Sequence, residues 1–339
     1  MKVIIIGAGG AIGSCLSGWL SEVSQDIYLF DKPSVSEVLK EKGITYYKQN
    51  EAKQNVKVKV IDSLSEVENP DLIAIVVKNY SLDGVSGLIK ETVKGNPVIL
   101  GLQNGVENQR ILPKYFDRVV YGIIEFNAWL DEIGIVGYQN RGPFVIGTLD
   151  NGMQAELKAI AELFNKGVET IITDRITDAA YCKMVINLTN SFTTLVGMGY
   201  RDITNLHAFK EILTNSMYEG VKILKKMGVK EYKAHTMPTW AKIKASATLP
   251  NFITDGMFKK NLAKMVLSSM AQDIIQRKSG ESELESLIGE FVSLGDRYGM
   301  DIPYNRAVYK LCKEKFNRHP FVPMTEEEVL AEVRKLQNK

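Results

Sequence analysis

The chain has 339 residues, of which 45% are hydrophobic and 24% charged, and its formal net charge is +2. This is the composition of an ordinary globular protein, and the length favours two domains. The small net charge argues against a surface built for nucleic acid or anionic membranes, and no apolar run approaches the ~20 residues that a membrane-spanning helix needs. We therefore expect a small-molecule partner, with no nucleic acid and no membrane.

Cysteine and histidine are scarce, and neither forms a metal-binding pattern. The three cysteines are far apart and make no CxxC pair; they are Cys15, Cys182 and Cys312. The three histidines are His207, His235 and His319, and none has a second ligand at the usual spacing. We therefore expect reduced thiols and no structural metal. We also expect a cytoplasmic protein, because residues 2–6 are too short for the core of a signal peptide.

The first 31 residues predict a dinucleotide-binding turn. An apolar run over 2–6 meets a glycine cluster, an amphipathic stretch follows, and a second apolar run over 27–30 ends in Asp31. One glycine lets the chain turn off the strand, another lets a pyrophosphate approach the backbone, and a third lets helix and strand pack closely. The helix N-terminus then faces the phosphates, and Asp31 can accept hydrogen bonds from the ribose hydroxyls.

The glycine spacing departs from the usual pattern. After Gly7 and Gly9 a glycine is expected at position 12, where the chain has Ile12, and the next glycine is Gly13. Either the turn is one residue longer, or Gly10 and Gly13 carry the last two roles with Ala8 in the first. The predicted phosphate-binding residues are Gly7, Gly9, Gly10, Ala11, Ile12 and Gly13.

The rest of the first half alternates strands and helices. Two apolar runs, 72–77 and 98–102, are typical of strands buried on both faces of a parallel sheet, and residues 119–125 are predicted to form another strand. Further strands are predicted within 44–61 and at 169–173, and a hairpin is predicted over 133–148, with its turn at residues 140–143. Helices are predicted at 35–42 (closed by Gly43), 82–93, 106–112 and 153–166. This pattern predicts an α/β fold with a Rossmann-like, doubly wound parallel sheet.

The pattern changes near Asp174, where long helical periods replace the strands. Helices are predicted at 178–195, 206–227, 261–277, 283–298 and 325–337. We expect a dinucleotide-binding domain over 1–174 and an all-helical substrate and dimerisation domain over 175–339. A homodimer is an expectation that the sequence leaves open.

Polar residues follow three predicted strands, at the edge where ligands bind in such sheets. They are Asp31, the segment Lys78-Asn79-Tyr80 and the segment Gln103-Asn104-Gly105. The alternative is that Asn79 and Asn104 only cap the helices that follow. An amide at Asn104 could instead bind the nicotinamide or a substrate oxygen.

Two clusters in the helical half could carry chemistry. Lys183, Asn187 and Ser191 recur at four-residue steps, with Asn190 beside them, on one face of an otherwise apolar helix. Desolvation there would suit a lysine general acid, although a solvated lysine is the simpler interpretation. The second cluster runs from Ser268 to Asp273 and is followed by three glutamates, Glu281, Glu283 and Glu285, which could equally be a solvated helix start.

Together these motifs resemble the ketopantoate reductase (2-dehydropantoate 2-reductase) family over nearly the whole length. The resemblance is carried by the glycine turn, Val77-Lys78-Asn79-Tyr80, Asn104-Gly105, Lys183-x-x-x-Asn187, Ser268-Ser269-Met270-Ala271-Gln272-Asp273 and Ser282-Glu283-Leu284-Glu285. It implies NAD(P)H-dependent reduction of 2-dehydropantoate to pantoate, in pantothenate and coenzyme A biosynthesis.

The resemblance also implies roles for individual residues. Lys183 would be the general acid for the ketone oxygen, and Asn104 and Lys78 would orient substrate and nicotinamide. Asn187 would bind the terminal hydroxyl of the substrate, with Ser191 nearby, and Ser269 its carboxylate. Glu283 would hold a substrate hydroxyl and help to place Lys183.

Two departures from the family pattern leave alternatives open. The family usually uses NADPH, whereas Asp31, with Lys32 next to it, would repel a 2′-phosphate and favour NADH. The spacing from Ser269 points to Glu281, whereas the local pattern points to Glu283. The alternatives are a dehydrogenase of another 2-keto or 2-hydroxy acid, and a nucleotide-binding regulatory protein without turnover.

Overall fold

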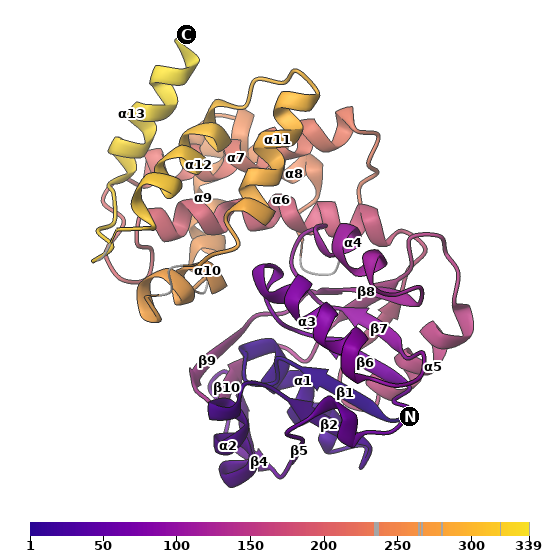
Figure 1. Ribbon diagram of the computed structural model, residues 1–339. Helices are drawn as coiled ribbons and strands as arrows, with labels where there is room; N and C mark the ends of the chain where they lie inside the picture. The colour runs from indigo at the N-terminus through magenta and orange to yellow at the C-terminus, as the bar shows by residue number, and fades with distance from the viewer. Residues whose placement is uncertain (234–236, 264, 266, 279–280, 319, 339) are drawn as a thin grey trace. The chain divides into compact units, whose positions relative to one another are not determined.

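The computed structural model describes residues 1–233, 237–263, 265, 267–278, 281–318 and 320–338 (Figure 1). The chain forms two compact units, Met1–Thr177 and Asp178–Lys339. Two of the three histidines considered above, His235 and His319, lie outside the described residues. In the part that is described, no helix is both long and apolar enough to cross a membrane.

The first unit is built on an eight-stranded sheet. Its strand order is β12-β11-β8-β7-β6-β1-β2-β5, and every neighbouring pair is parallel except β8 with β11. The strands are β1 (Val3–Ile6), β2 (Ile27–Phe30), β5 (Lys59–Val60), β6 (Leu72–Ile75), β7 (Val98–Gly101), β8 (Val119–Ile124), β11 (Phe144–Gly147) and β12 (Thr170–Ile172). The chain order reverses at β1, between β2 and β6, so the predicted doubly wound parallel sheet is confirmed and its topological switch point lies at β1.

Helices of this unit connect the strands as the apolar periods predict. They are α1 (Ala11–Ser21), α2 (Pro33–Lys42), α3 (Asn79–Thr92), the short α4 (Asn108–Ile111) and α5 (Gln154–Phe164), with 3-10 turns at Leu64–Glu66 and Leu112–Lys114. Gly43 ends α2 with φ +69°, a backbone conformation that glycine adopts without strain. Trp19, Phe144 and Phe164 fill the core beside the sheet and have no or almost no exposed surface.

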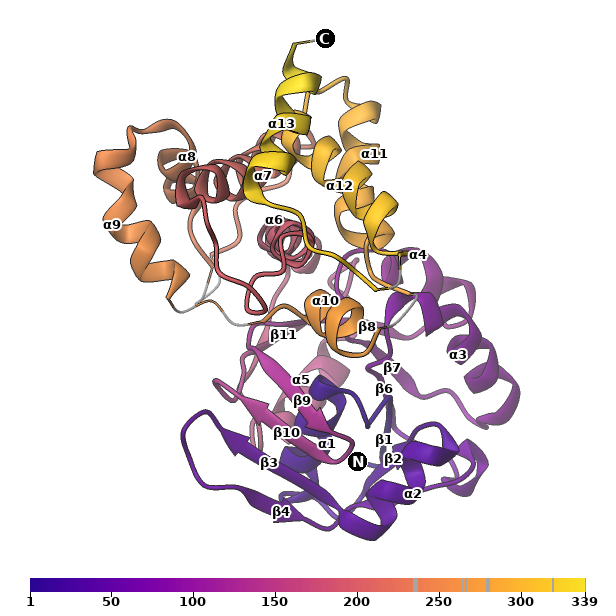
Figure 2. The same cartoon turned by 90° about the vertical axis from the view of Figure 1, so that its left-hand side faces the viewer.

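The predicted hairpin over 133–148 is wrong. Its two halves, β10 (Ile135–Tyr138) and β11, belong to different sheets. β10 pairs with β9 (Ala128–Glu132) and β3 (Ile44–Lys48) in a small sheet that also holds β4 (Gln54–Val56), as Figure 2 shows. The turn residues between the halves therefore carry the chain from one sheet to the other. The sequence pattern of a tight turn is the same in both cases, because it does not specify which strand the chain pairs with next.

The second unit is helical throughout its described part, apart from one isolated bridge between Met198 and Arg201. Its helices are α6 (Ile176–Leu195, whose first two residues belong to the first unit), α7 (Leu206–Lys226), α8 (Trp240–Thr248), α9 (Asn251–Leu262), α10 (Ser269–Ala271), α11 (Glu290–Arg297), α12 (Pro303–Lys315) and α13 (Glu326–Gln337). Short π-helical turns occupy Gln272–Gln276 and Glu285–Gly289. The sequence pattern did not predict helices α8, α9 and α12.

The predicted helix over 261–277 is a second correction. Helix α9 ends at Leu262, and α10 begins only at Ser269. Ser268 causes the new start, because its hydroxyl accepts a hydrogen bond from the Ala271 N–H at 3.1 Å and so caps α10. The helix predicted from 283 likewise starts as a π-helical turn at Glu285 before α11 follows.

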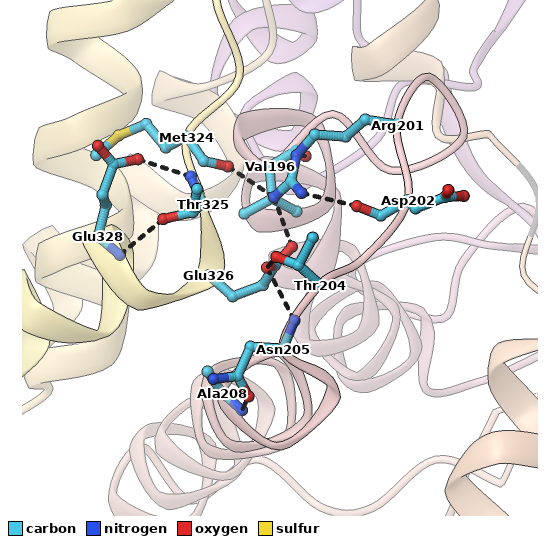
Figure 3. A network of polar contacts seen from close by, with 10 residues as sticks. All are labelled: Val196, Arg201, Asp202, Thr204, Asn205, Ala208, Met324, Thr325, Glu326 and Glu328. Atoms are coloured by element: carbon cyan, nitrogen blue, oxygen red, sulfur yellow. Dashed lines mark hydrogen bonds and ion pairs between the residues drawn. The ribbon is translucent and has the colours of Figure 1, made fainter.

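A buried ion pair fastens the last helix to this unit (Figure 3). Glu326, in the first turn of α13, has no exposed surface and accepts from Arg201 Nη2 at 2.5 Å and from Thr204 Oγ1 at 2.9 Å. Arg201 also donates to the carbonyls of Val196 and Met324. The helix itself starts in a capping box, in which Thr325 and Glu328 exchange hydrogen bonds.

Candidate active site

The glycine turn after β1 has the geometry of a longer phosphate-binding loop. Gly7 has φ +89° and its carbonyl accepts the Gly10 N–H at 3.3 Å, so the chain reverses at Gly7. A Cβ atom at Gly13 would lie 2.0 Å from the Gly7 oxygen, so Gly13 is the residue that allows helix and strand to touch. Gly13 has this role in both alternatives, and the positive φ puts the sharp turn at Gly7 and not at Ala8.

The middle glycines leave the N-terminus of α1 open. A Cβ at Gly9 would lie 2.3 Å from Val35 Cγ1, whereas one at Gly10 would meet only the Gly7 oxygen at 3.6 Å. Gly10 is exposed and precedes the first helical residues, Ala11 and Ile12, which are partly buried. The unpaired N–H groups of a first helical turn and the positive end of its dipole suit a diphosphate.

Asp31 is hydrogen-bonded to the glycine turn. Its Oδ2 accepts the Gly9 N–H at 2.8 Å, and its Oδ1 accepts the Lys32 N–H at 2.7 Å. The carboxylate thus links the glycine turn to the start of α2. A carboxylate accepts about four hydrogen bonds, so these two contacts leave capacity for ribose hydroxyls.

The ends of β6 and β7 are joined by amide side chains. Lys78, not Asn79, is the N-cap of α3, and no side-chain capping bond forms there. Asn79 instead donates from Nδ2 to the Asn104 carbonyl oxygen at 2.6 Å, so the interpretation of Asn79 as a helix cap is wrong. Asn104 and Lys78 are partly buried, and Gly105 turns the chain with φ +90°.

In the second unit, α6 carries a polar strip on an apolar helix. Lys183 and Asn187 are partly buried, and Ser191 has no exposed surface. Asn187 Nδ2 and Ser191 Oγ are buried atoms that lack a hydrogen-bond partner among the described residues. Their flanking residues Met184 and Val185 lie in the core. A buried donor without a partner costs stability, so a strip of this kind suits a site whose partners come from a ligand.

The Ser268–Asp273 segment lies against the C-terminal end of α6. The hydroxyl groups of Ser268 and Thr194 are 3.2 Å apart. Ser269 begins α10 and is partly buried. Next to this segment is a cavity of about 260 Å³ with largely apolar walls; its lining includes Met198, Tyr200, Met265, Leu267 and Ala271.

The glutamates after this segment differ in burial. Glu283 is 5% exposed, whereas Glu281 and Glu285 are exposed. Glu285 pairs on the surface with Lys313 and Tyr309. Of these three glutamates, Glu283 is therefore the one whose carboxylate is largely shielded from water.

Metal or thiol chemistry finds no support in the described residues. No group of three or more His, Cys, Asp or Glu side chains there could hold a metal ion. None of the three cysteines forms a disulfide and all are buried, and burial raises the pKa of the Cys15 and Cys312 thiols well above their usual range.

The dinucleotide fold with its glycine turn and strand-end acid defines a class of nucleotide-dependent oxidoreductases, and comparison with known proteins gives the family. The family model described as "Ketopantoate reductase PanE/ApbA" matches residues 3–168, and its C-terminal counterpart matches residues 175–316. The chain belongs to the ketopantoate reductase family and is an oxidoreductase, as the sequence motifs implied.

Individual relatives are distant but span the chain. A 2-dehydropantoate 2-reductase of Pyrococcus abyssi (strain GE5 / Orsay) is 26% identical over 317 residues, covering 93% of this chain and 98% of the relative. The crystal structure of a ketopantoate reductase from Ralstonia eutropha JMP134 superposes with a TM-score of 0.73 at 24% identity, covering 99% of this chain and 100% of that one. D-mandelate dehydrogenase with NADH and anilino(oxo)acetate has the same TM-score, 0.73, at 20% identity, with 99% of each chain covered.

Proposed function

We propose that this enzyme reduces 2-dehydropantoate to pantoate with NAD(P)H, a step of pantothenate and coenzyme A biosynthesis. The observation that carries the proposal is the family match over both units, together with the named relative that covers 93% of the chain. The proposed dinucleotide-binding domain spans 1–174, and the proposed substrate and dimerisation domain spans 175–339.

The first domain would hold the nucleotide. Residues 7–13 would receive the diphosphate, and Asp31 the adenosine ribose. Lys78 and Asn104, at the ends of β6 and β7, would orient the nicotinamide and the substrate. When bound, the reduced nicotinamide supplies the hydride that reaches C2 of the keto acid.

The second domain would supply the proton and the substrate contacts. Lys183 Nζ would donate a proton to the ketone oxygen as negative charge develops on it, and would then regain one from solvent. Asn187 has a buried donor to offer the terminal hydroxyl, and Ser269 and Ser191 offer hydroxyl groups for the remaining oxygens. Glu283 would hold a substrate hydroxyl from a buried position and help to place Lys183.

The preferred nucleotide in this proposal is NADH. Both oxygens of Asp31 accept hydrogen bonds from backbone N–H groups, which would hold the carboxylate where a 2′-phosphate would otherwise lie. Lys32 follows directly and would offset part of the repulsion.

A second candidate is reduction of a different 2-keto acid with a larger apolar side chain. The cavity beside Ser268, with Met198 and Leu267 in its wall, favours this alternative. Comparing the rates on 2-dehydropantoate and on an aryl keto acid separates the two.

The experiment that tests the proposal measures oxidation of NADH and NADPH with 2-dehydropantoate for wild type, Lys183→Ala and a control. The control is Lys310→Ala, a lysine of the same unit that is 55% exposed and pairs with Glu332. We expect turnover by wild type, a fall in kcat of about 10²-fold or more for Lys183→Ala, and no change for the control. Binding of nucleotide without turnover of 2-dehydropantoate would refute the proposal.

A further inference from the structure

Asn79 is a buried residue at the start of a helix, but its side-chain amide does not cap that helix. It is the first residue of α3, 4% exposed, and its Nδ2 reaches across to the main chain of the next strand-end loop, at Asn104 O, 2.6 Å away. The bond therefore fixes a peptide unit 25 residues further along the chain. No capping role competes for the side chain, because Lys78 is the N-cap.

The loop that contains Asn104 is tethered from its other side as well. Gln103 Nε2 donates to the carbonyls of Ile75 at 2.8 Å and Val77 at 3.2 Å, and its Oε1 accepts from Asn108 Nδ2 at 3.3 Å. The Gln103 side chain thus holds the loop to the end of β6, one residue before the peptide that Asn79 holds.

Stability alone does not explain an asparagine at position 79. Its Oδ1 is buried and lacks a hydrogen-bond partner among the residues that the structure describes. An unsatisfied buried oxygen lowers the stability of the fold, which offsets much of what the single bond from Nδ2 contributes. A functional role for the hydrogen bond from Asn79 Nδ2 to the Asn104 carbonyl therefore explains this asparagine better than stability does.

We propose that Asn79 is a positioning residue, which fixes the main chain at Asn104 so that the Asn104 amide is aimed at the reacting groups. This inference rests on the proposed function, in which Asn104 orients the nicotinamide and the substrate. Asn79 holds the carbonyl of Asn104, the side chain of the preceding residue, Gln103, holds the loop to the end of β6, and Gly105 turns the chain away directly after Asn104. The side chain of Asn104 is then the part of this loop whose direction the tethers define.

The test compares Asn79→Asp, Asn79→Ala and a matched control. The aspartate has the same shape but places an oxygen against the Asn104 carbonyl, and the alanine removes the donor without adding charge. The control is Asn165→Asp, because Asn165 Nδ2 also donates to a main-chain carbonyl five residues along, Thr170 O at 3.1 Å, at strand β12, which β11 and β8 separate from β7. All three are measured for kcat, KM and thermal unfolding.

We expect kcat/KM to fall about 10–100-fold for Asn79→Asp, the cost of a displacement near 1 Å at a reacting centre, and less than twofold for Asn165→Asp. The decisive readout is a double-mutant cycle with Asn104→Ala. If Asn79 acts through Asn104, then Asn79→Ala adds almost nothing in the Asn104→Ala background. Losses that multiply in the double variant, or Asn79 variants that match the control, overturn the proposal.

Failure of the proposed function gives a different result. In that case wild type reduces no keto acid, and the cycle is read from the dissociation constant of NADH. A rise of about tenfold for Asn79→Asp that disappears in the Asn104→Ala background supports the positioning role. Equal dissociation constants for wild type and Asn79→Asp overturn it.

Discussion

The charge at Asp31 gives the sharpest prediction, because the residue has two separable roles. In Asp31→Asn the side chain keeps its shape, but only one of its two terminal atoms can still accept a hydrogen bond. One of the contacts from Gly9 N and Lys32 N is therefore lost. A hydrogen bond to a charged group contributes about 1.5–3 kcal/mol, so the glycine turn loosens and NADH binding weakens.

The effect on NADPH has the opposite sign. A 2′-phosphate carries about −1.5 to −2 charges, and two unit charges about 5 Å apart interact by roughly 1 kcal/mol in water and more near a protein surface. Removing the Asp31 charge therefore relieves repulsion of about 1.5–3 kcal/mol, which is roughly 10–100-fold in affinity. The ratio of the two dissociation constants should shift toward NADPH by at least about tenfold.

Fluorescence titration of each reduced nucleotide measures this ratio directly. Asp26→Asn is the matched control, because Asp26 is exposed and stands at the opposite end of β2. The control should leave both constants unchanged. An unchanged ratio in Asp31→Asn would refute the reasoning, since the carboxylate would then not face the ribose.

Three further changes test other parts of the structure. Glu326→Ala leaves the Arg201 guanidinium without its buried partner and should lower the free energy of unfolding by about 3–5 kcal/mol in denaturant titrations; a loss under about 1 kcal/mol would contradict this. Burial raises the pKa of Glu219 to about 7, so the folded state binds a proton more tightly than the unfolded state. Wild type should therefore lose stability relative to Glu219→Gln as the pH rises from about 5 to 8, and parallel pH profiles would exclude the shift. Gly13→Ala puts a methyl group 2.0 Å from the Gly7 oxygen and should abolish nucleotide binding or folding, whereas Gly84→Ala, at a site with open space, should do neither.

Local features of the fold could be predicted because neighbouring residues determine them. The order of β1, the glycine turn, α1 and β2 follows from apolar periodicity and from the positions of four glycines. The error over 133–148 is of another kind. Strand pairing depends on residues far away, and β10 pairs with β3, some ninety residues earlier in the chain. No turn pattern contains that information.

In the candidate site, too, contacts between residues near in sequence could be predicted, whereas contacts between distant residues could not. Gly7, Gly13 and Asp31 are near in sequence, and their geometry agrees with the predicted kind of turn. The contact from Asn79 to Asn104 joins two loops that are neighbours only because β6 pairs with β7. The sequence could place both residues at the same sheet edge, but it could not predict which amide would hold the other.

The choice between Glu281 and Glu283 rests on two arguments that disagree. The spacing from Ser269 that the family resemblance implies points to Glu281, and a π-helical turn over Gln272–Gln276 lies within this stretch. The local motif, which does not depend on that count, selects Glu283, and Glu283 is also the buried carboxylate. Loss of activity in Glu283→Gln with an unaffected Glu281→Gln would therefore support the motif, and the reverse would favour the spacing.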